Sequence, residues 1–282
     1  MGMLISTEKR LAKSKEHANV YQKQIEHMIE REVARKLSQT ELKNYKEPIH
    51  YISHHEVLKP DSKSTPVRIV FYSSARYMGH MLNDYWTKGP HLLNDLLGVL
   101  IRFRENNIAM IGDIKKMYHT VKIKTIEQHT HRYLWRDMDT RRPPDTYVIQ
   151  RVSFGDKPSG TIATVALRKT AEMGADRYPE ATQVIKENTY MDDIIESTPT
   201  KEKATKLTKD IKALLDEGNF KMIELIYSNL YPTTNPLIRK RCWELFGTQF
   251  KTNLYIKCTF EPHPRNNQTI RLMTMTTTQR KE

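Results

Sequence analysis

The chain has 282 residues and a formal net charge of +13, from 46 Lys and Arg against 33 Asp and Glu. Such an excess favours an anionic partner, of which nucleic acid is the commonest. Two cysteines, Cys242 and Cys258, exclude a disulfide-rich scaffold and a four-cysteine zinc site within this chain, and we expect them to be free thiols. The sequence has neither an apolar run of the ~20 residues that cross a membrane nor a long apolar signal segment. We therefore expect an intracellular protein that is not secreted and does not bind a membrane.

The first quarter of the sequence carries signals for two helices and a strand. Apolar residues recur every four positions within Asn19–Leu37, which predicts one amphipathic helix there. Ser38–Glu41 has the pattern of a capping box, and the short helix that it opens should end before Pro48. Val67–Phe71 is a short, mostly β-branched run, which predicts a strand.

The middle of the sequence alternates apolar runs with polar segments. Leucines at helical spacing predict a helix across Leu93–Phe103. Ile108–Ile111 predicts a buried strand, with Asp113 at its end. The segment Asp137–Asp145 is polar and contains two prolines, which indicates a loop, and Tyr147–Phe154 alternates as a strand does.

The following segments predict two more helices and a hairpin. Thr161–Arg177 is compatible with a helix, and Ala204–Leu214 has a clear helical stripe that stops at Gly218. Thr189–Ile195 has the pattern of a hairpin, with two aspartates at a two-residue tip. Because strands and helices interleave, the class is α/β or α+β with a mixed sheet.

Three aspartates carry the strongest chemical signal: Asp113, Asp192 and Asp193. Adjacent strands of one sheet would bring their carboxylates to one edge. Crowded carboxylates repel one another and need cations nearby, and oxygen ligands suit hard cations such as Mg²⁺. Phosphoryl transfer between nucleotides uses two such cations held by carboxylates. The alternative is that each aspartate is an ordinary loop residue.

Two of these segments resemble motifs of a known family. Tyr190–Asp193 resembles the YxDD box of reverse transcriptases, and Asp113–Tyr118 resembles their first catalytic motif. Phe154–Gly160 falls between the two, where these polymerases carry a glycine-containing loop. The ordered series, from about residue 20 to 229, most resembles the reverse transcriptases of BEL/Pao-type long-terminal-repeat retrotransposons. Other matching stretches are His54–Pro60, Arg68–Phe71, Leu82–Trp86, Leu134–Trp135 and Gly218–Phe220.

This resemblance implies an α+β, right-hand polymerase fold with fingers and palm, a mixed sheet packed on helices, and an incomplete thumb. The implied division is an N-terminal helical segment at 1–48 that leads into the fingers, mainly fingers at 49–105, and palm at 106–230 with a fingers insertion at about 122–153. Residues 231–282 would hold a degenerate, primer-grip-like segment and the start of the connection. The chain would be a fragment of a larger polyprotein.

The implied activity is that of an RNA-directed DNA polymerase, a nucleotidyltransferase that adds deoxynucleotides to a primer 3′-hydroxyl. Its partners would be deoxynucleoside triphosphates and a primer–template duplex of RNA/DNA or DNA/DNA. The catalytic residues and metal ligands would be Asp113, Asp192 and Asp193, holding two Mg²⁺ ions that Mn²⁺ can replace. The implied substrate-binding residues are Tyr118, Arg68, Tyr190, Met191, Phe154, Gly155 and Lys221.

Three of these roles have a structural alternative, and four residues depart from the family pattern. Tyr118 is either a gate against the ribose 2′-hydroxyl or core packing, Arg68 either contacts the triphosphate or is solvated, and Met191 either supports the primer end or packs. The departures are Tyr72, Ile223, Leu225 and Phe250.

These departures leave a second function open, a nucleic-acid-binding remnant that does not polymerise. A metal nuclease fits the ordered motifs less well. Either protein would reside in the cytoplasm, in a retroelement particle, or in the nucleus. A zinc site at His54 and His55 is disfavoured, because adjacent residues of a strand point to opposite faces.

Overall fold

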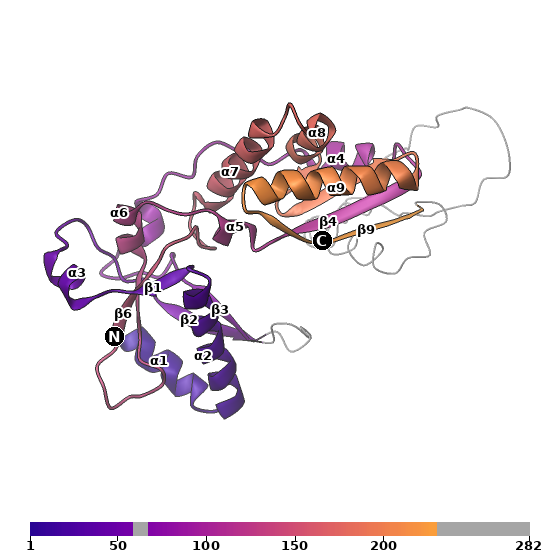
Figure 1. The fold of residues 1–282 in the computed structure, drawn as a ribbon. Helices are drawn as coiled ribbons and strands as arrows, with labels where there is room; N and C mark the ends of the chain where they lie inside the picture. The colour runs from indigo at the N-terminus through magenta and orange to yellow at the C-terminus, as the bar shows by residue number, and fades with distance from the viewer. Residues whose placement is uncertain (59–66, 230–282) are drawn as a thin grey trace, which may run out of the picture. The chain divides into compact units, whose positions relative to one another are not determined.

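The computed structural model describes residues 1–58 and 67–229, and of residues 224–229 only the backbone. The chain divides into two units, Met1–Tyr227 and Ser228–Glu282. The elements described below lie in the first unit, except that the last strand continues to Asn229 (Figure 1). The expectations for residues 231–282, including Cys242, Phe250 and Cys258, fall outside the described residues.

The N-terminal half combines helices with two small antiparallel sheets. One sheet has the order β1-β6-β5 and the other pairs β2 with β3. The elements are α1 (Gly2–Leu11), α2 (Lys15–Glu30), β1 (Ala34–Lys36), α3 (Gln39–Asn44), β2 (His54–Leu58), β3 (Val67–Phe71), a 3₁₀ turn η1 (Leu82–Asp84), β5 (Arg132–Trp135) and β6 (Asp145–Ile149).

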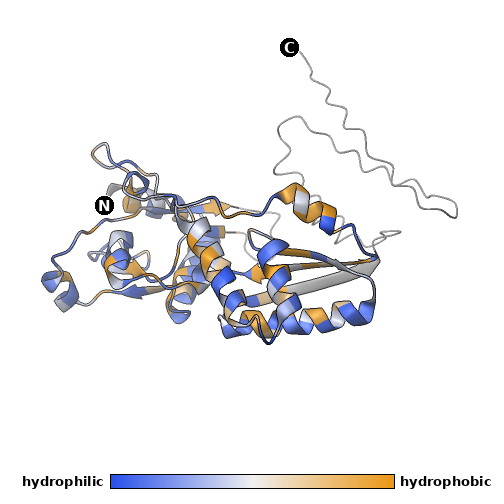
Figure 2. Cartoon of the chain, turned by 90° about the horizontal axis from the view of Figure 1, so that it is seen from above, coloured by the Kyte–Doolittle hydropathy of each residue, from blue (hydrophilic) through white to orange (hydrophobic). Residues whose placement is uncertain are grey.

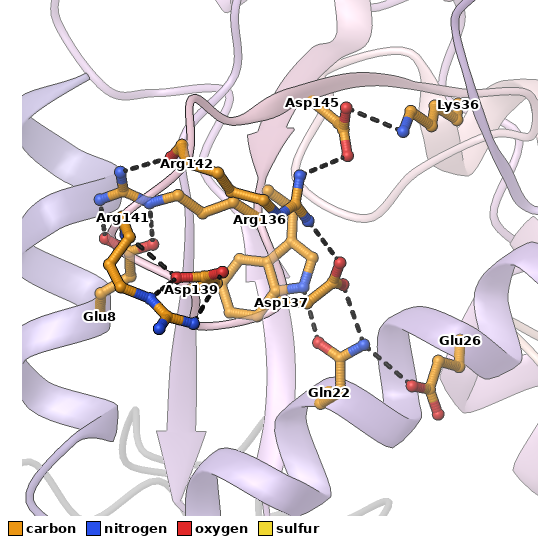
Figure 3. Close-up of polar contacts among 11 residues, drawn as sticks. Glu8, Gln22, Glu26, Lys36, Arg136, Asp137, Asp139, Arg141, Arg142 and Asp145 are labelled. Carbon is orange, nitrogen blue, oxygen red and sulfur yellow. Dashed lines mark hydrogen bonds and ion pairs between the residues drawn. The ribbon is translucent and has the colours of Figure 1, made fainter.

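These elements enclose an apolar core that we call the N-terminal cluster. Its buried members are Leu4, Leu11, Tyr21, Ile25, Ala34, Ile52, Val67, Phe71, Leu82, Tyr133, Trp135, Tyr147 and Ile149. A buried ion pair ties α1 to the end of β5, since Arg136 Nε and Nη2 donate to the two carboxylate oxygens of Glu8 at 2.7 and 2.6 Å (Figure 3). The residues from 132 to 149 therefore pack with the first half of the chain.

The rest of the first unit is built on a four-stranded sheet with the order β7-β8-β4-β9. Its strands are β4 (Ile108–Lys115), β7 (Thr189–Tyr190), β8 (Asp193–Thr198) and β9 (Lys221–Asn229). The helices and turns of this part are α4 (Leu96–Arg102), α5 (Met117–Thr120), α6 (Thr125–Gln128), the 3₁₀ turn η2 (His129–His131), α7 (Ser159–Met173), α8 (Pro179–Glu187) and α9 (Lys201–Glu217).

Three helices, α7, α8 and α9, pack with this sheet in a second core, the C-terminal cluster. Its members are Ile108, Met110, Ile114, Met117, Ala163, Leu167, Ala171, Ala181, Val184, Ile185, Ile194, Ala204, Leu207, Ile211, Leu214, Leu215 and Phe220. The helices carry hydrophobic and hydrophilic stripes, as helices with one face on a core do (Figure 2). Because side chains alternate along a strand, the even-numbered residues of β4 face these helices and Asp113 lies on the other face.

Several local predictions are confirmed. Ser38 and Glu41 form the capping box of α3 by exchanging side-chain and backbone hydrogen bonds, and the helix ends at Asn44, before Pro48. The strand at Val67–Phe71 has the expected bounds. Helix α9 ends with Gly218 at its C-cap.

One predicted helix is wrong in its second half. The helix expected over Asn19–Leu37 stops at Glu30, and Glu32 takes a positive φ of 54° that turns the chain. The next residues, Ala34–Lys36, form β1 and pair antiparallel with β6. Ile29 is therefore exposed, whereas Val33 and Leu37 are buried outside any helix.

Other boundaries shift for local reasons. The helix expected from Leu93 begins at Leu96, because the Asp95 side chain caps its first turn through Gly98 N–H. The strand expected to continue to Phe154 ends at Ile149, as β6. The helix expected over 161–177 spans 159–173, and Gly174 is its C-cap.

The fold is α+β, and every strand pair whose register is described is antiparallel, so the expected mixed sheet is not found among these pairs. Within the described ranges, no helix is both long and apolar enough to cross a membrane.

Candidate active site

Strand register places two of the three aspartates side by side. Asp113 lies in β4, directly opposite Asp193 of β8 in the antiparallel pairing that begins at Ile108 and Thr198. Residues directly opposite in such a pair share a face of the sheet, with Cα atoms about 4.5–5.5 Å apart. Asp193 is buried and Asp113 is half-buried. The strand is longer than expected, so Asp113 lies within β4 rather than after its end.

The third aspartate occupies the tip of the adjoining hairpin. Tyr190 pairs with Asp193, which makes Met191 and Asp192 the two tip residues. The expected two-residue hairpin is present, but its tip holds one aspartate, since Asp193 is already the first residue of β8. The Ile114 N–H donates to the Asp192 carbonyl at 2.8 Å, which ties the tip to β4. Met191 is 47% exposed and has a φ of 56°, an uncommon conformation that two-residue hairpins require.

The three residues fit a magnesium site by donor type and by backbone position. Carboxylate oxygens are the ligands that Mg²⁺ prefers, and Asp113, Asp192 and Asp193 occupy neighbouring backbone positions at the same end of β4 and β8, the two inner strands of the sheet. In the part of the chain that the structure describes, no group of three His, Cys, Asp or Glu side chains is already arranged to hold an ion. Binding would therefore require these carboxylates to turn toward a shared ion.

Tyr118 follows the strand that carries Asp113. It belongs to the short helix α5, which follows Lys116 in a left-handed conformation with a φ of 51°. Burial raises the pKa of Tyr118, and the negative charge of Asp192 raises it further. The ring is half-buried against the C-terminal cluster and lies 4.4 Å, between ring centroids, from Phe154. Tyr118 thus combines packing with a position at the site.

The loop at Phe154–Gly155 forms the neighbouring wall. Phe154 is 53% exposed, and its ring contacts both Tyr118 and His119. Gly155 has a φ of 102°, and a Cβ placed there would lie 3.2 Å from the Phe71 carbonyl oxygen. Glycine is therefore required here for both conformation and space.

The two remaining predicted contacts have no described connection to the aspartates. Arg68 is exposed on β3 opposite Val57, in the two-stranded sheet of the N-terminal half. Lys221 begins β9, and its Nζ forms an ion pair with Asp216 Oδ1 at 2.8 Å. Their predicted roles remain predictions.

His54 and His55 do not form a metal site with a third His, Cys, Asp or Glu among the described residues. Both ring nitrogens of the buried His54 are already used: one faces the Tyr21 hydroxyl and the other the Leu134 carbonyl oxygen. Neither is available to a metal without breaking these contacts.

Similar solved structures come from the foamy viruses. One structure of the Prototype Foamy Virus protease–reverse transcriptase matches 74% of this chain with a TM-score of 0.55 and 13% identity. The foamy viral enzyme in complex with double-stranded DNA matches 72% with a TM-score of 0.53 and 18% identity, and the same enzyme with an RNA/DNA hybrid matches 70% with 0.51 and 17%. The chain has a reverse-transcriptase-like fold.

The match covers only part of those proteins. This chain spans 24%, 36% and 22% of the three foamy viral chains. No family model matches the sequence, and no curated protein matches it. The BEL/Pao subtype therefore stays a prediction that rests on the motifs quoted above.

Sequence reasoning missed the residues that hold the Phe154–Gly155 loop. Asp156 and His131 form a buried ion pair at 2.9 Å, and Asn83 binds the loop backbone on both sides of Asp156. Asp156 lies between Gly155 and a lysine–proline pair, a composition that is typical of a loop and does not indicate a buried partner. Nothing in the sequence pattern could identify a histidine 25 positions earlier as that partner.

Proposed function

We propose that this chain is the polymerase part of an RNA-directed DNA polymerase, with fingers and palm subdomains, derived from a BEL/Pao-type retrotransposon polyprotein. The observation that carries the proposal is the cross-strand pairing of Asp113 with Asp193, next to Asp192 at the hairpin tip. The reverse-transcriptase-like fold and the net charge of +13 support it. In the solved relatives the same fold is found with double-stranded DNA and with an RNA/DNA hybrid.

In this proposal the three aspartates bind two Mg²⁺ ions, which Mn²⁺ can replace. The bound metal would lower the pKa of the primer 3′-hydroxyl and stabilise charge on the phosphates of the incoming nucleotide. Asp113 and Asp193 supply ligands from neighbouring strands, and Asp192 supplies one from the tip. The backbone hydrogen bond from Ile114 to Asp192 fixes the tip relative to β4.

The surrounding side chains select and hold the substrates. In this proposal the Tyr118 ring excludes a ribose 2′-hydroxyl by steric clash. Phe154 and Gly155 border the nucleotide, and Tyr190 and Met191 support the primer end. Two longer-range contacts complete the proposal. Arg68 would bind triphosphate oxygens through its guanidinium group. Lys221 is a candidate proton donor to pyrophosphate, although its pairing with Asp216 gives it a structural role as well.

The test is primer extension on a homopolymeric RNA template with Mg²⁺ or Mn²⁺. The wild-type chain should bind the duplex and extend the primer. Changing Asp192→Asn together with Asp193→Asn should reduce extension by about 100-fold or more, as loss of charge-stabilising groups does. Duplex binding should persist or tighten, because two negative charges near the phosphates are removed. Asp176→Asn, at an exposed aspartate between α7 and α8, is the matched control and should extend as the wild type does.

The same assay separates this function from that of a binding remnant. Both functions predict duplex binding that weakens steeply with salt through counterion release. If the wild-type chain binds duplex tightly at low salt and extends no primer with either metal, the polymerase proposal fails and the remnant function stands.

A further inference from the structure

A buried ion pair lies behind the loop that contacts Tyr118. His131 Nε2 is 2.9 Å from Asp156 Oδ2, and the two side chains are only 5% and 7% exposed. The second carboxylate oxygen of Asp156 accepts a hydrogen bond from the Ser73 hydroxyl. The Trp86 ring stacks on His131 with 6.0 Å between centroids. Asp156 is thereby held from two segments that are distant in sequence.

The hydrogen bonds of His131 define its charge. Its Nδ1 lies 3.0 Å from the Glu127 carbonyl oxygen, and its Nε2 faces the carboxylate of Asp156. The Thr130 hydroxyl, 3.2 Å from Nδ1, already donates to the Glu127 carbonyl oxygen and so can only accept from the ring. With acceptors at both nitrogens, both nitrogens donate and the imidazole is protonated. Burial alone would lower the pKa of His131, but the hydrogen bond and charge of Asp156 outweigh burial and raise it. The pair is therefore a salt bridge between two buried charges.

Asn83 fixes the loop backbone next to this salt bridge. Its Nδ2 donates to the Gly155 carbonyl oxygen at 2.9 Å, and its Oδ1 accepts from the Lys157 N–H at 2.9 Å. Asp156 lies between these two bonded residues. The loop is consequently bound at three successive residues, and the exposed Phe154 projects from its edge onto Tyr118.

We propose that His131, Asp156 and Asn83 form a clamp that positions Phe154 against Tyr118 and so sets the affinity of the site for the incoming nucleotide. The inference rests on the proposed polymerase function. The three members are positioning residues, since they act through Phe154 and Gly155. Because the clamp holds the Phe154–Gly155 loop in place, the loop need not become ordered when the nucleotide binds. Loosening the loop should therefore raise the KM for the nucleotide more than it lowers kcat.

The clamp itself is tested without any assay of activity. Asp156→Asn keeps the shape of the side chain but leaves His131 without a counter-charge, and breaking a buried pair in this way is strongly destabilising locally. Amide hydrogen exchange of residues 153–158 in the full chain should become at least about tenfold faster, the Lys157 amide included. Asp176→Asn is the matched control and should leave this exchange unchanged. Unchanged exchange in Asp156→Asn overturns the clamp, whatever the chain catalyses.

A second variant covers the case in which Asp156→Asn does not fold. Ser73→Ala removes one hydrogen bond to Asp156 and leaves the ion pair in place, so it should speed exchange of the same amides by a smaller factor. If Ser73→Ala leaves the exchange of residues 153–158 at the wild-type rate while Asp156→Asn is unfolded, the clamp is likewise overturned.

The role in nucleotide binding is tested by steady-state primer extension. Asp156→Asn should raise the KM for the deoxynucleotide by about tenfold or more, with a smaller change in kcat. Phe154→Leu should raise the KM too, and the double variant should be no worse than the poorer single one, because both act on one wall. Additive effects, or a fall in kcat alone, overturn the proposed role. A wild-type chain that extends no primer overturns the polymerase function and this role with it, whereas the exchange experiment still decides whether the clamp exists.

Discussion

Acidification should destabilise this fold through one buried histidine, His54. The residue begins β2 and is 4% exposed within the N-terminal cluster. Its Nε2 lies 2.9 Å from the Leu134 carbonyl oxygen, which only accepts, so Nε2 carries the proton. Its Nδ1 then accepts from the Tyr21 hydroxyl. The neutral ring is thus fully hydrogen-bonded. A second proton, on Nδ1, would displace the hydrogen bond that Nδ1 now accepts from the Tyr21 hydroxyl.

The magnitude follows from the pKa of His54. Burial lowers that pKa from 6.5 to about 4 in the folded chain. The unfolded chain therefore takes up its proton at a higher pH than the folded chain does. For a base with a lowered folded pKa, the contribution to stability is complete above pH 6.5 and is lost as the pH falls toward 4. The difference of about 2.5 pH units, at 1.36 kcal/mol per unit, amounts to roughly 3 kcal/mol.

The measurement is the free energy of unfolding in denaturant at several pH values from 7 to 4. His54→Gln keeps an N–H for Leu134 but cannot gain a proton, so between pH 7 and 4 it should lose roughly 3 kcal/mol less than the wild type. His27→Gln, which changes an exposed histidine of α2, should follow the wild type. Partial burial also lowers the pKa of His119 to about 4, but this residue is present in the wild type and in both variants. If His54→Gln loses as much stability on acidification as the wild type, the buried neutral state of His54 is wrong.

Three further outcomes are expected. Tyr118→Val should raise incorporation of ribonucleotides relative to deoxyribonucleotides, measured by competing the two triphosphates; unchanged discrimination would make Tyr118 a packing residue only. Gly218→Ala should lower the unfolding free energy by about 1–3 kcal/mol, because the new Cβ would lie 2.3 Å from Thr170 Oγ1, whereas Gly2→Ala meets nothing within 4 Å and should be nearly neutral. Gly155→Ala should slow primer extension, since its φ of 102° and the nearby Phe71 carbonyl oppose a side chain; a fully active variant would contradict this geometry.

The elements that were predicted correctly are those whose signals are local. A capping box needs only Ser38 and Glu41, and both of its hydrogen bonds are formed. The stripe within Ala204–Leu214 identifies α9 because one face of a helix repeats every 3.6 residues, and Gly218 ends it. The apolar run at Val67–Phe71 forms a strand because β-branched side chains suit a pleated surface.

The error over Asn19–Leu37 has a non-local cause. The apolar spacing continues past Glu30, so the pattern by itself predicts one long helix. The backbone groups of Ala34–Lys36 instead pair with β6, more than one hundred residues later in the chain. Val33 and Leu37 are buried, as the pattern requires, but from an extended backbone rather than from a helix. For Val33 and Leu37, the hydrophobic spacing correctly predicted burial in the core. It did not predict whether a helix or an extended segment contains them.

In the candidate site too, the features with local sequence signals were predicted and those that depend on tertiary structure were not. Each aspartate stood beside a local strand or hairpin signal, and so the meeting of Asp113 with Asp193 could be expected from the sequence. The partner of Asp156 could not, because its ion pair with His131 depends on how the loop packs against η2. Buried polar pairs of this kind depend on tertiary structure, and they produce no periodic pattern of residues in the sequence from which they could be predicted.

The same contacts link the N-terminal cluster to the candidate site, which lies on the sheet of the C-terminal cluster. Tyr118 packs against the C-terminal cluster, whereas its ring partner Phe154 belongs to a loop held through Ser73, Asn83 and His131. Each of these three residues is next to, or within two positions of, a member of the N-terminal cluster. A change in the N-terminal cluster can therefore reach Tyr118 through few contacts. It would first displace the clamp residues, then the Phe154 loop that they hold, and then the Tyr118 ring that Phe154 contacts. A substitution that loosens the N-terminal cluster without unfolding it should consequently alter nucleotide affinity before it alters the pairing of the aspartates, because that pairing lies between β4 and β8, in the sheet of the C-terminal cluster.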